Sequence, residues 1–423
     1  MTTVIILAVL LGLLALRIPV AMALGGLGII LLVIGGFSPL IAPQALQSST
    51  QNFVLLSVPL FMLMSNILLK GGVGRDLFAA VQAWVGHWPG GLAVATVISC
   101  GLFSAISGSS VACAATIGTV AIPEMISRGY PRHFTYGLLA AGGTLGILIP
   151  PSIPLIVYGF ITEESITALF LAGVGPGILM CFLFAAYSMF YAARSSQVIS
   201  LPKATAGERR AATLRALPAV AVAIFVFAAI YSGAATPTEA AAVGFAFSLL
   251  LTTVVLRTMT WQKFKEAVVG AMVTTVVILI IVGAAKVFGK AIALYRIPQD
   301  ISTFIIDSIG STEPFLAAIT VVLFIMGCFL ESISMMLLMV PVLAPALPAI
   351  GLDPIWFGIY FVIMIECALI TPPVGLNLYV IQSIARADMR TVAAGVWPFV
   401  VIMLLTALLI HVFPGIVLLL TRL

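Results

Sequence analysis

The stretch LIPPSIP at residues 148–154 and the stretch TPPVGLN at residues 371–377 decide the fold of this chain. Each places two adjacent prolines, Pro150–Pro151 and Pro372–Pro373, inside an apolar segment of membrane-spanning length. Proline has no amide proton, so a helix breaks there and leaves backbone groups that lipid cannot satisfy. Two such breaks in corresponding halves of a chain predict a transport site.

The composition is that of a membrane protein with many spans. Of 423 residues, 62% are hydrophobic and 8% are charged, whereas about 25% are charged in soluble domains. Apolar runs such as residues 170–191 and 217–231 predict long helices, not the short alternating strands of an outer-membrane barrel. We therefore expect an all-α polytopic membrane protein, with residues 4–16 as its first span because no lysine or arginine precedes them.

Neither the cysteines nor the net charge indicates a cofactor or nucleic acid. The five cysteines stand singly on apolar segments without CxxC spacing, which is typical of small buried residues. The net charge of +5 is expected in cytoplasmic loops. We expect no cofactor and no nucleic-acid partner.

The distribution of lysine and arginine predicts an inverted duplication. Residues 194–215 hold four arginines and one lysine against the single acid Glu208, so the positive-inside rule makes them a cytoplasmic linker. Counting spans in both directions gives two repeats of opposite orientation, residues 1–193 and residues 216–423. The same count places Glu163 and Lys286 near the outer side, where Lys286 would reach the membrane interface.

Each repeat is expected to contain scaffold spans, an interfacial arm helix, a re-entrant hairpin and a broken helix. In the first repeat the last three are residues 72–88, 91–127 and 133–160. In the second repeat they are residues 286–307, 310–350 and 354–384.

Serine hydroxyls and backbone carbonyls without helical donors are oxygen ligands suited to a hard cation such as Na⁺. The first hairpin turns at SAISGSS, residues 104–110, where serine hydroxyls accompany freed carbonyls. The prolines remove the helical donors of the Gly146 and Ile147 carbonyls, and the same reasoning selects Ala368 and Leu369 in the second repeat. The alternatives are a serine-rich packing face and a simple proline kink.

Two carboxylates lie at membrane depth, where an ionisable group costs about 2.5–3.5 kcal/mol or more. Glu331 in the second hairpin is a candidate cation ligand, proton site or helix-end partner. Glu366, just before the second break, is either a hydrogen-bond partner of neighbouring helices or a coupling group. An intramembrane enzyme is not expected, because residues 107–110 have no histidine or acid nearby in sequence to activate a serine.

Five motifs in combination resemble the large membrane subunit of tripartite ATP-independent periplasmic (TRAP) transporters. They are PLFMLMSN at 59–66, FSAISGSS at 103–110, GGTLGILIPPS at 142–152, TPTEAAAVG at 236–244 and ITPPVGLN at 370–377. The resemblance extends over about residues 5–420. It implies a multi-pass protein of the bacterial inner membrane with an elevator-type fold similar to that of divalent-anion/sodium symporters.

The resemblance also implies partners and a coupling ion. The partners are a small four-helix membrane subunit, expected as a separate chain, and a periplasmic substrate-binding protein. The implied activity is Na⁺-driven import of an organic acid, with a C4-dicarboxylate, sialic acid and other sugar or keto acids all open. The alternative is a stand-alone Na⁺- or H⁺-coupled dicarboxylate symporter.

Transferred residue by residue, the resemblance implies two Na⁺ sites and a substrate contact. The first Na⁺ site would comprise Ser107, Ser109, Ser110, Gly146, Ile149 and Pro151. The second would comprise Ser332, Ser334, Ala368, Thr371 and Val374. Ser152 and Asn377 would contact a substrate carboxylate, helped by the partial positive charge of half-helix amino termini, and Glu331 is a possible coupling residue.

Overall fold

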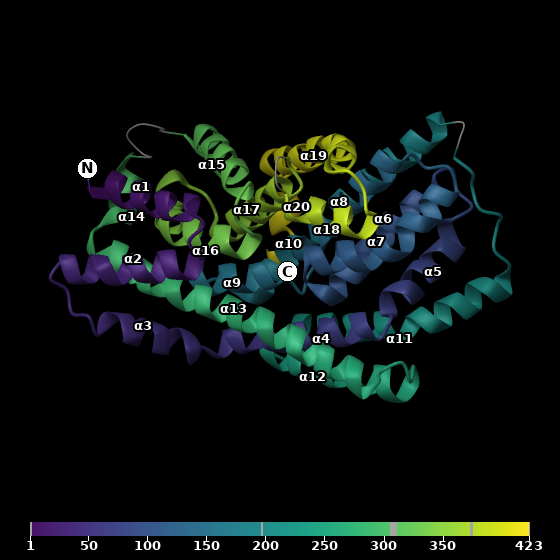
Figure 1. Ribbon diagram of the computed structural model, residues 1–423, viewed down its shortest axis with the longest axis horizontal. Helices are drawn as coiled ribbons and strands as arrows, with labels where there is room; N and C mark the ends of the chain where they lie inside the picture. Colours follow the sequence, from purple (N-terminus) through teal and green to yellow (C-terminus); the bar gives the residue numbers. More distant parts are fainter. Residues whose placement is uncertain (1, 196–197, 305–310, 373–374, 423) are drawn as a thin grey trace.

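The computed structural model describes residues 2–195, 198–304, 311–372 and 375–422, and within these ranges the regular structure is entirely helical (Figure 1). Seven of the described helices are long and apolar enough to cross a membrane. An eighth span results if α8 (Arg132–Leu148) and α9 (Ile153–Thr162), bent by 42° at the first proline pair, are counted as one. The prediction of an all-α polytopic membrane protein is confirmed.

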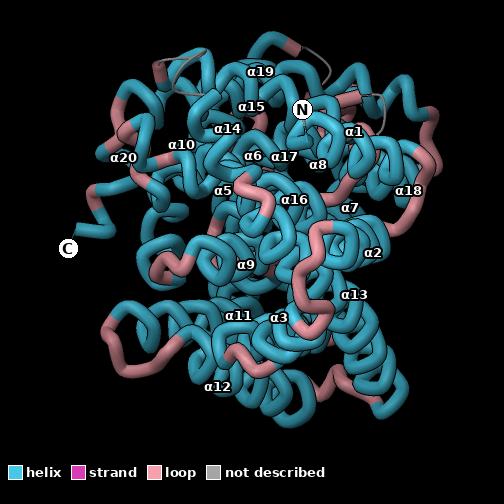
Figure 2. Tube along the Cα trace, turned by 90° about the vertical axis from the view of Figure 1, so that its left-hand side faces the viewer, coloured by secondary structure: helices cyan, strands magenta, loops and turns pink. Residues whose placement is uncertain are grey.

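The helices form two layers, which we call the scaffold layer and the hairpin layer (Figure 1 and Figure 2). In the scaffold layer, α13 packs against three other helices and α12 packs against α4 and α11. Its members are α2 (Val20–Ile34), α3 (Ile41–Thr50), α4 (Ser57–Lys70), α11 (Ala206–Tyr231), α12 (Pro237–Leu250) and α13 (Trp261–Leu294).

The hairpin layer contains two pairs of antiparallel helices and two broken helices. Its members are α6 (Gly91–Ser107), α7 (Ser110–Ser127), α8, α9, α10 (Ile166–Arg194), α15 (Thr312–Gly327), α16 (Ser332–Leu343), α17 (Pro354–Leu369), α18 (Leu376–Ala385) and α19 (Met389–Val412). The remaining helices of four or more residues are α1 (Thr2–Ala15), α5 (Val73–Val85), α14 (Ile297–Phe304), α20 (Gly415–Leu418), the 3₁₀ turn Phe53–Leu56 and the π-helical turn Leu251–Val255.

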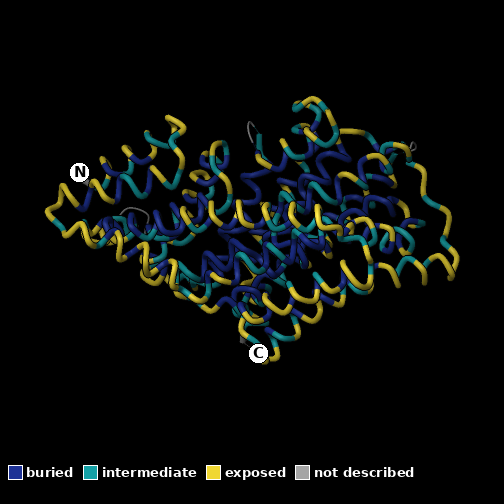
Figure 3. Tube along the Cα trace, turned by 60° about the horizontal axis from the view of Figure 1, so that its bottom comes forward, coloured by how far each residue is buried: buried dark blue, intermediate teal, exposed yellow. Residues whose placement is uncertain are grey.

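The two halves of the chain interlock within the hairpin layer. The second helix of the first hairpin, α7, packs against α18, and the second helix of the other hairpin, α16, packs against α9. Each hairpin thus meets the far half of the broken helix that belongs to the other repeat. Buried residues run through the middle of the molecule, whereas exposed residues line its edges (Figure 3). Many of these are large and apolar, such as Val269, Val273 and Val276 on α13, as expected for a surface in lipid.

Local sequence explains where the helices of the first hairpin end. Gly108 ends α6 in the left-handed region, with φ 60°, which glycine adopts without steric cost. Ser109 then caps α7 by accepting a hydrogen bond from the amide of Ala112 at 3.4 Å. The chain therefore reverses within two residues.

Two features differ from the sequence-based expectation. Residues 286–307 do not form a separate arm, because α13 continues through Lys286 and Lys290 to Leu294 and only α14 follows as an independent helix; residues 305–307 lie outside the described part. Lysine is a good helix former, so it does not mark a helix end. The second difference is α3, a short helix rich in glutamine and serine that has no counterpart in the predicted elements.

Candidate functional site

The tip of the first hairpin rests directly on the first helix break. A Cβ atom placed on Gly146 would lie 2.6 Å from the carbonyl oxygen of Ser109 and 2.9 Å from the amide nitrogen of Ser110. A Cβ on Gly108 would meet the carbonyl oxygen of Pro151. Only glycine permits this approach of the two backbones. The structure therefore brings together Ser109, Ser110, Gly146 and Pro151, four of the six residues expected at the first Na⁺ site.

The other two expected members flank this contact. Ser107 is buried at the end of α6, and its hydroxyl has no hydrogen-bond partner among the described residues. Ile149 ends α8, where its amide donates to the carbonyl of Leu145 at 3.0 Å. The next two residues are prolines, so the carbonyls of Gly146 and Ile147 have no helical donor. Oxygen atoms without donors at a helix break are the ligands that a hard cation prefers.

The second hairpin meets the second break in a similar way, through Gly327 at the end of α15. A Cβ placed on Gly327 would lie 3.1 Å from the carbonyl oxygen of Ala368. This carbonyl also accepts a hydrogen bond from the amide of Thr371 at 3.2 Å. The prediction that the Ala368 carbonyl is left without a donor was therefore wrong, because the last turn of α17 tightens into an i to i+3 bond.

The remaining residues expected at the second Na⁺ site are spread around this break. The hydroxyl of Thr371 donates to the carbonyl of Cys367 at 2.6 Å. Ser332 and Ser334 lie in the first turn of α16. Val374 lies outside the described residues.

Glu331, the possible coupling residue, precedes α16 and is exposed. It lines a cavity of about 290 Å³ together with Ser334 and Leu376, so hairpin two and the start of α18 share one space. Val20 of the scaffold layer lines the same cavity. Glu331 therefore lies where the two layers and the second break meet.

Three buried polar side chains near the breaks, Ser152, Asn377 and Glu366, differ in their hydrogen bonding. Ser152 caps α9 by accepting from the amide of Leu155 at 3.4 Å. Asn377 and Glu366 are at most 1% exposed, and their side-chain polar atoms have no hydrogen-bond partner among the described residues. Such groups are costly to bury without a partner. Ser110 and Cys113 of α7 lie near the Glu366 carboxylate, so this part of the second broken helix lies beside the first hairpin.

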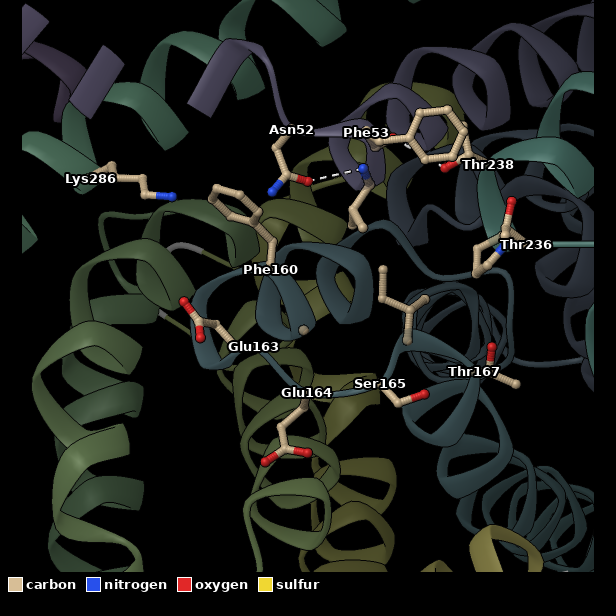
Figure 4. Close-up of a pocket in the computed structure, with 14 residues that line it drawn as sticks. Asn52, Phe53, Phe160, Glu163, Glu164, Ser165, Thr167, Thr236, Thr238 and Lys286 are labelled. Atoms are coloured by element: carbon tan, nitrogen blue, oxygen red, sulfur yellow. Dashed lines mark hydrogen bonds between the residues drawn. The ribbon is translucent and has the colours of Figure 1, made fainter. Parts of the chain in front are cut away.

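The structure contains a further cavity, which we call the outer crevice and which the sequence alone does not reveal. It is a cavity of about 480 Å³ between the scaffold and hairpin layers, at the end that the lysine and arginine count predicts to lie outside (Figure 4). Its lining residues come from four separate places in the sequence. They are residues 52–54, 159–160, 163–167, 236–238 and Lys286.

One wall of the outer crevice is the start of α12, which bears the motif TPTEAAAVG. Thr236 accepts from the amide of Glu239 at 3.3 Å, and the Glu239 carboxylate accepts from the amide of Thr236 at 2.8 Å. The sequence pattern of threonine, proline and glutamate indicates this capping box. The nearby hydroxyl of Thr238 donates to the carbonyl of Phe53 at 3.2 Å, which joins α12 to the 3₁₀ turn that precedes α4.

Among the described residues, no three histidine, cysteine, aspartate or glutamate side chains gather as a metal cluster would require. The described cysteines are unpaired.

Comparison with known proteins shows which family the chain belongs to. Residues 7–416 match the family model described as the DctM component of tripartite ATP-independent periplasmic transporters. The C4-dicarboxylate TRAP transporter large permease protein DctM of Pseudomonas aeruginosa is 35% identical, covering 88% of this chain and 87% of that protein. The sialic acid TRAP transporter large permease SiaM of Vibrio cholerae is 34% identical, covering 98% and 97%. The ectoine TRAP transporter large permease TeaC of Halomonas elongata is 35% identical, covering 99% and 98%.

A solved structure supports the fold independently. The YdaH transporter of Alcanivorax borkumensis, described as having an unusual topology, superposes with a TM-score of 0.60 over 88% of this chain and 87% of its own. Its sequence identity is 15%, so the likeness extends to the fold alone. Together with the apolar spans and the near full-length matches, these findings show that the chain belongs to the TRAP transporter large permeases, the DctM components, and is a multi-pass protein of the inner membrane.

Proposed function

We propose that this subunit imports an organic acid across the inner membrane by coupling its movement to Na⁺. The observation that carries the proposal is the pairing of each helix break with a hairpin tip, at Gly146 with Ser109 and at Ala368 with Gly327. In lipid, interrupted backbone is tolerated where it is buried in protein or lines a cavity. Paired breaks of this kind suit an ion and a solute held side by side near the middle of the membrane.

The first Na⁺ is assigned to the contact between hairpin one and the first break, where Gly146 and Ile147 present carbonyls without helical donors. The second Na⁺ is assigned to the contact between α15, α16 and the second break. The hydroxyl oxygens of Thr371 and Ser334 would be two of its ligands. The solute carboxylate is assigned to Asn377, whose buried amide group has no partner among the described residues. Elevator movement of the hairpin layer against the scaffold layer would then carry both across.

The solute class is proposed from the relatives. Their names specify C4-dicarboxylate, sialic acid and ectoine, and an isethionate transporter of Oleidesulfovibrio alaskensis is 32% identical. All are small and carry an acidic group. A small membrane subunit and a periplasmic binding protein are the proposed partners.

Uptake by proteoliposomes tests the proposal. The large subunit is reconstituted with its small subunit, and radiolabelled solute is supplied on the binding protein encoded beside it. An inward Na⁺ gradient should accelerate uptake, and replacing Na⁺ with K⁺ or omitting either partner should abolish it. Uptake that is unchanged by removing Na⁺ would refute the coupling. Uptake by the large subunit alone would establish the stand-alone symporter instead.

A further inference from the structure

The outer crevice continues into a second cavity. This cavity measures about 320 Å³ and shares Phe160, Glu163 and Lys286 with the first, so the two cavities adjoin at these residues. From here on the outer crevice means both cavities. Its walls come from α13 of the scaffold layer and from α9 and α16, which belong to different repeats of the hairpin layer. The combined space therefore opens between the layers, away from the two helix breaks.

Two lysines of α13 project into this space. Lys286 and Lys290 lie one helical turn apart, and both line the second cavity. Neither forms an ion pair within 4.0 Å with a described carboxylate. Like charges one turn apart on a helix repel, so the pair would be stabilised by an anion between them. Lys70, by contrast, forms an ion pair with Glu266 at 2.7 Å.

The surroundings of Lys286 combine charge with apolar surface. Its ammonium group lies 4.6 Å from the centre of the Phe160 ring, and Figure 4 shows its side chain directed toward that ring. Glu163 lines the same cavity, and Figure 4 shows its carboxylate on the same side of the Phe160 ring as the ammonium group of Lys286. Val282 and Ala285 of α13 itself and Leu337 of α16 add apolar lining. A cavity of a few hundred Å³ with apolar walls and a few charged groups is typical of a site for a small organic ligand.

We propose that the outer crevice is a reception site for a small organic carboxylate, with Lys286 and Lys290 binding the carboxylate and Phe160 contacting the apolar body. The site is separate from the one at the helix breaks. It rests on the proposed function only in identifying this carboxylate as the transported solute. Glu163 is a built-in competitor, since its carboxylate faces the same ammonium group that an incoming anion would use.

Photolabelling tests this site without requiring transport. The probe is 4-azidobenzoate, applied to the complex of large and small subunits in nanodiscs of zwitterionic lipid, and 4-azidobenzamide is its uncharged counterpart. Labelled peptides are mapped by mass spectrometry. The acid should label residues 153–165, 282–299 or 337–345 in a saturable way that succinate suppresses, and the amide should label them weakly.

Variants separate the roles of the charged groups. Lys286→Gln and Lys290→Gln should each raise the half-saturating probe concentration about fivefold, and Glu163→Gln should lower it by a similar factor. Lys265→Gln lies on α13 at its opposite end and serves as the matched control, with no change expected. Equal melting temperatures of the variants exclude misfolding as the cause.

Three outcomes would overturn the proposal. They are equal labelling by acid and amide, half-saturation that is unchanged in both lysine variants, and labelling that phosphatidylglycerol in the nanodiscs abolishes while succinate has no effect. The last result would assign the crevice to an anionic lipid headgroup. Na⁺-dependent uptake without crevice labelling would remove this site alone, whereas labelling without Na⁺-dependent uptake would refute the coupling and leave the site intact.

Discussion

At the scale of single residues, Gly137 of α8 and Gly395 of α19 let the two helices pack backbone against backbone, with no room for a methyl group between them. A Cβ placed on Gly137 would meet the carbonyl of Gly395, and a Cβ on Gly395 would meet the carbonyl of His133. We predict that Gly395→Ala destabilises the protein by about 1–3 kcal/mol, because the two helices must separate. Thermal unfolding in detergent measures the change.

Gly26→Ala is the control for that substitution. Gly26 also lies within a helix, but a Cβ there would have no neighbour within 4 Å. Alanine should leave the melting temperature unchanged or raise it slightly, since it favours helix over glycine by up to about 1 kcal/mol. Equal melting temperatures for the two variants would show that the α8 and α19 backbones adjust without cost.

At the scale of elements, the first hairpin and the first break act as one unit through Gly146. We predict that Gly146→Ala raises the Na⁺ concentration for half-maximal uptake at least tenfold, because the added methyl displaces the backbone of Ser109 and Ser110. Gly142→Ala is the matched control. It lies one turn earlier on α8 and would contact the sulfur of Cys100 at 2.9 Å, so it perturbs the packing of α6 without touching the hairpin tip. A similar Na⁺ dependence in the two variants would contradict the assignment.

Elements set by local chemistry could be predicted from the sequence, and those set by packing could not. The proline pair at 150–151 and the glycine at 108 act on their own backbone, so the break and the hairpin turn were expected near where they lie. The sequence predicts a separate helix from residue 286, but α13 continues to Leu294. Lysine is common both within helices and near their ends, so Lys286 and Lys290 do not locate the end of α13. The amide of Thr371 donates a hydrogen bond to the carbonyl of Ala368 because the last turn of α17 tightens. The position of the prolines alone does not predict this hydrogen bond.

At the scale of the whole molecule, the outer crevice arises from the arrangement of the two layers. Its lining includes residues of α9, α10, α12, α13, α14 and α16, and of the 3₁₀ turn at Phe53. Helices that are apolar on all sides carry no periodicity that identifies their packing partners. The sequence therefore predicted an all-helical membrane fold and the first helix break, whereas the pairing of α7 with α18 and of α16 with α9 required the structure.

This pairing predicts that the two repeats assemble without a covalent connection. Ahead of α11, the linker's backbone hydrogen bonds to other parts of the chain run from Ile199 to Arg128 and from Leu201 to Gly86, both in the first repeat. Fragments 1–203 and 204–423, expressed together with an affinity tag on one, should co-purify and retain most of the uptake of the intact chain, because the α7–α18 and α16–α9 contacts remain. Each fragment expressed alone should be degraded or aggregate, since it exposes surfaces that the other repeat buries. Two fragments that purify separately as folded monomers would show that the repeats are independent units and that interlocking does not stabilise the hairpin layer.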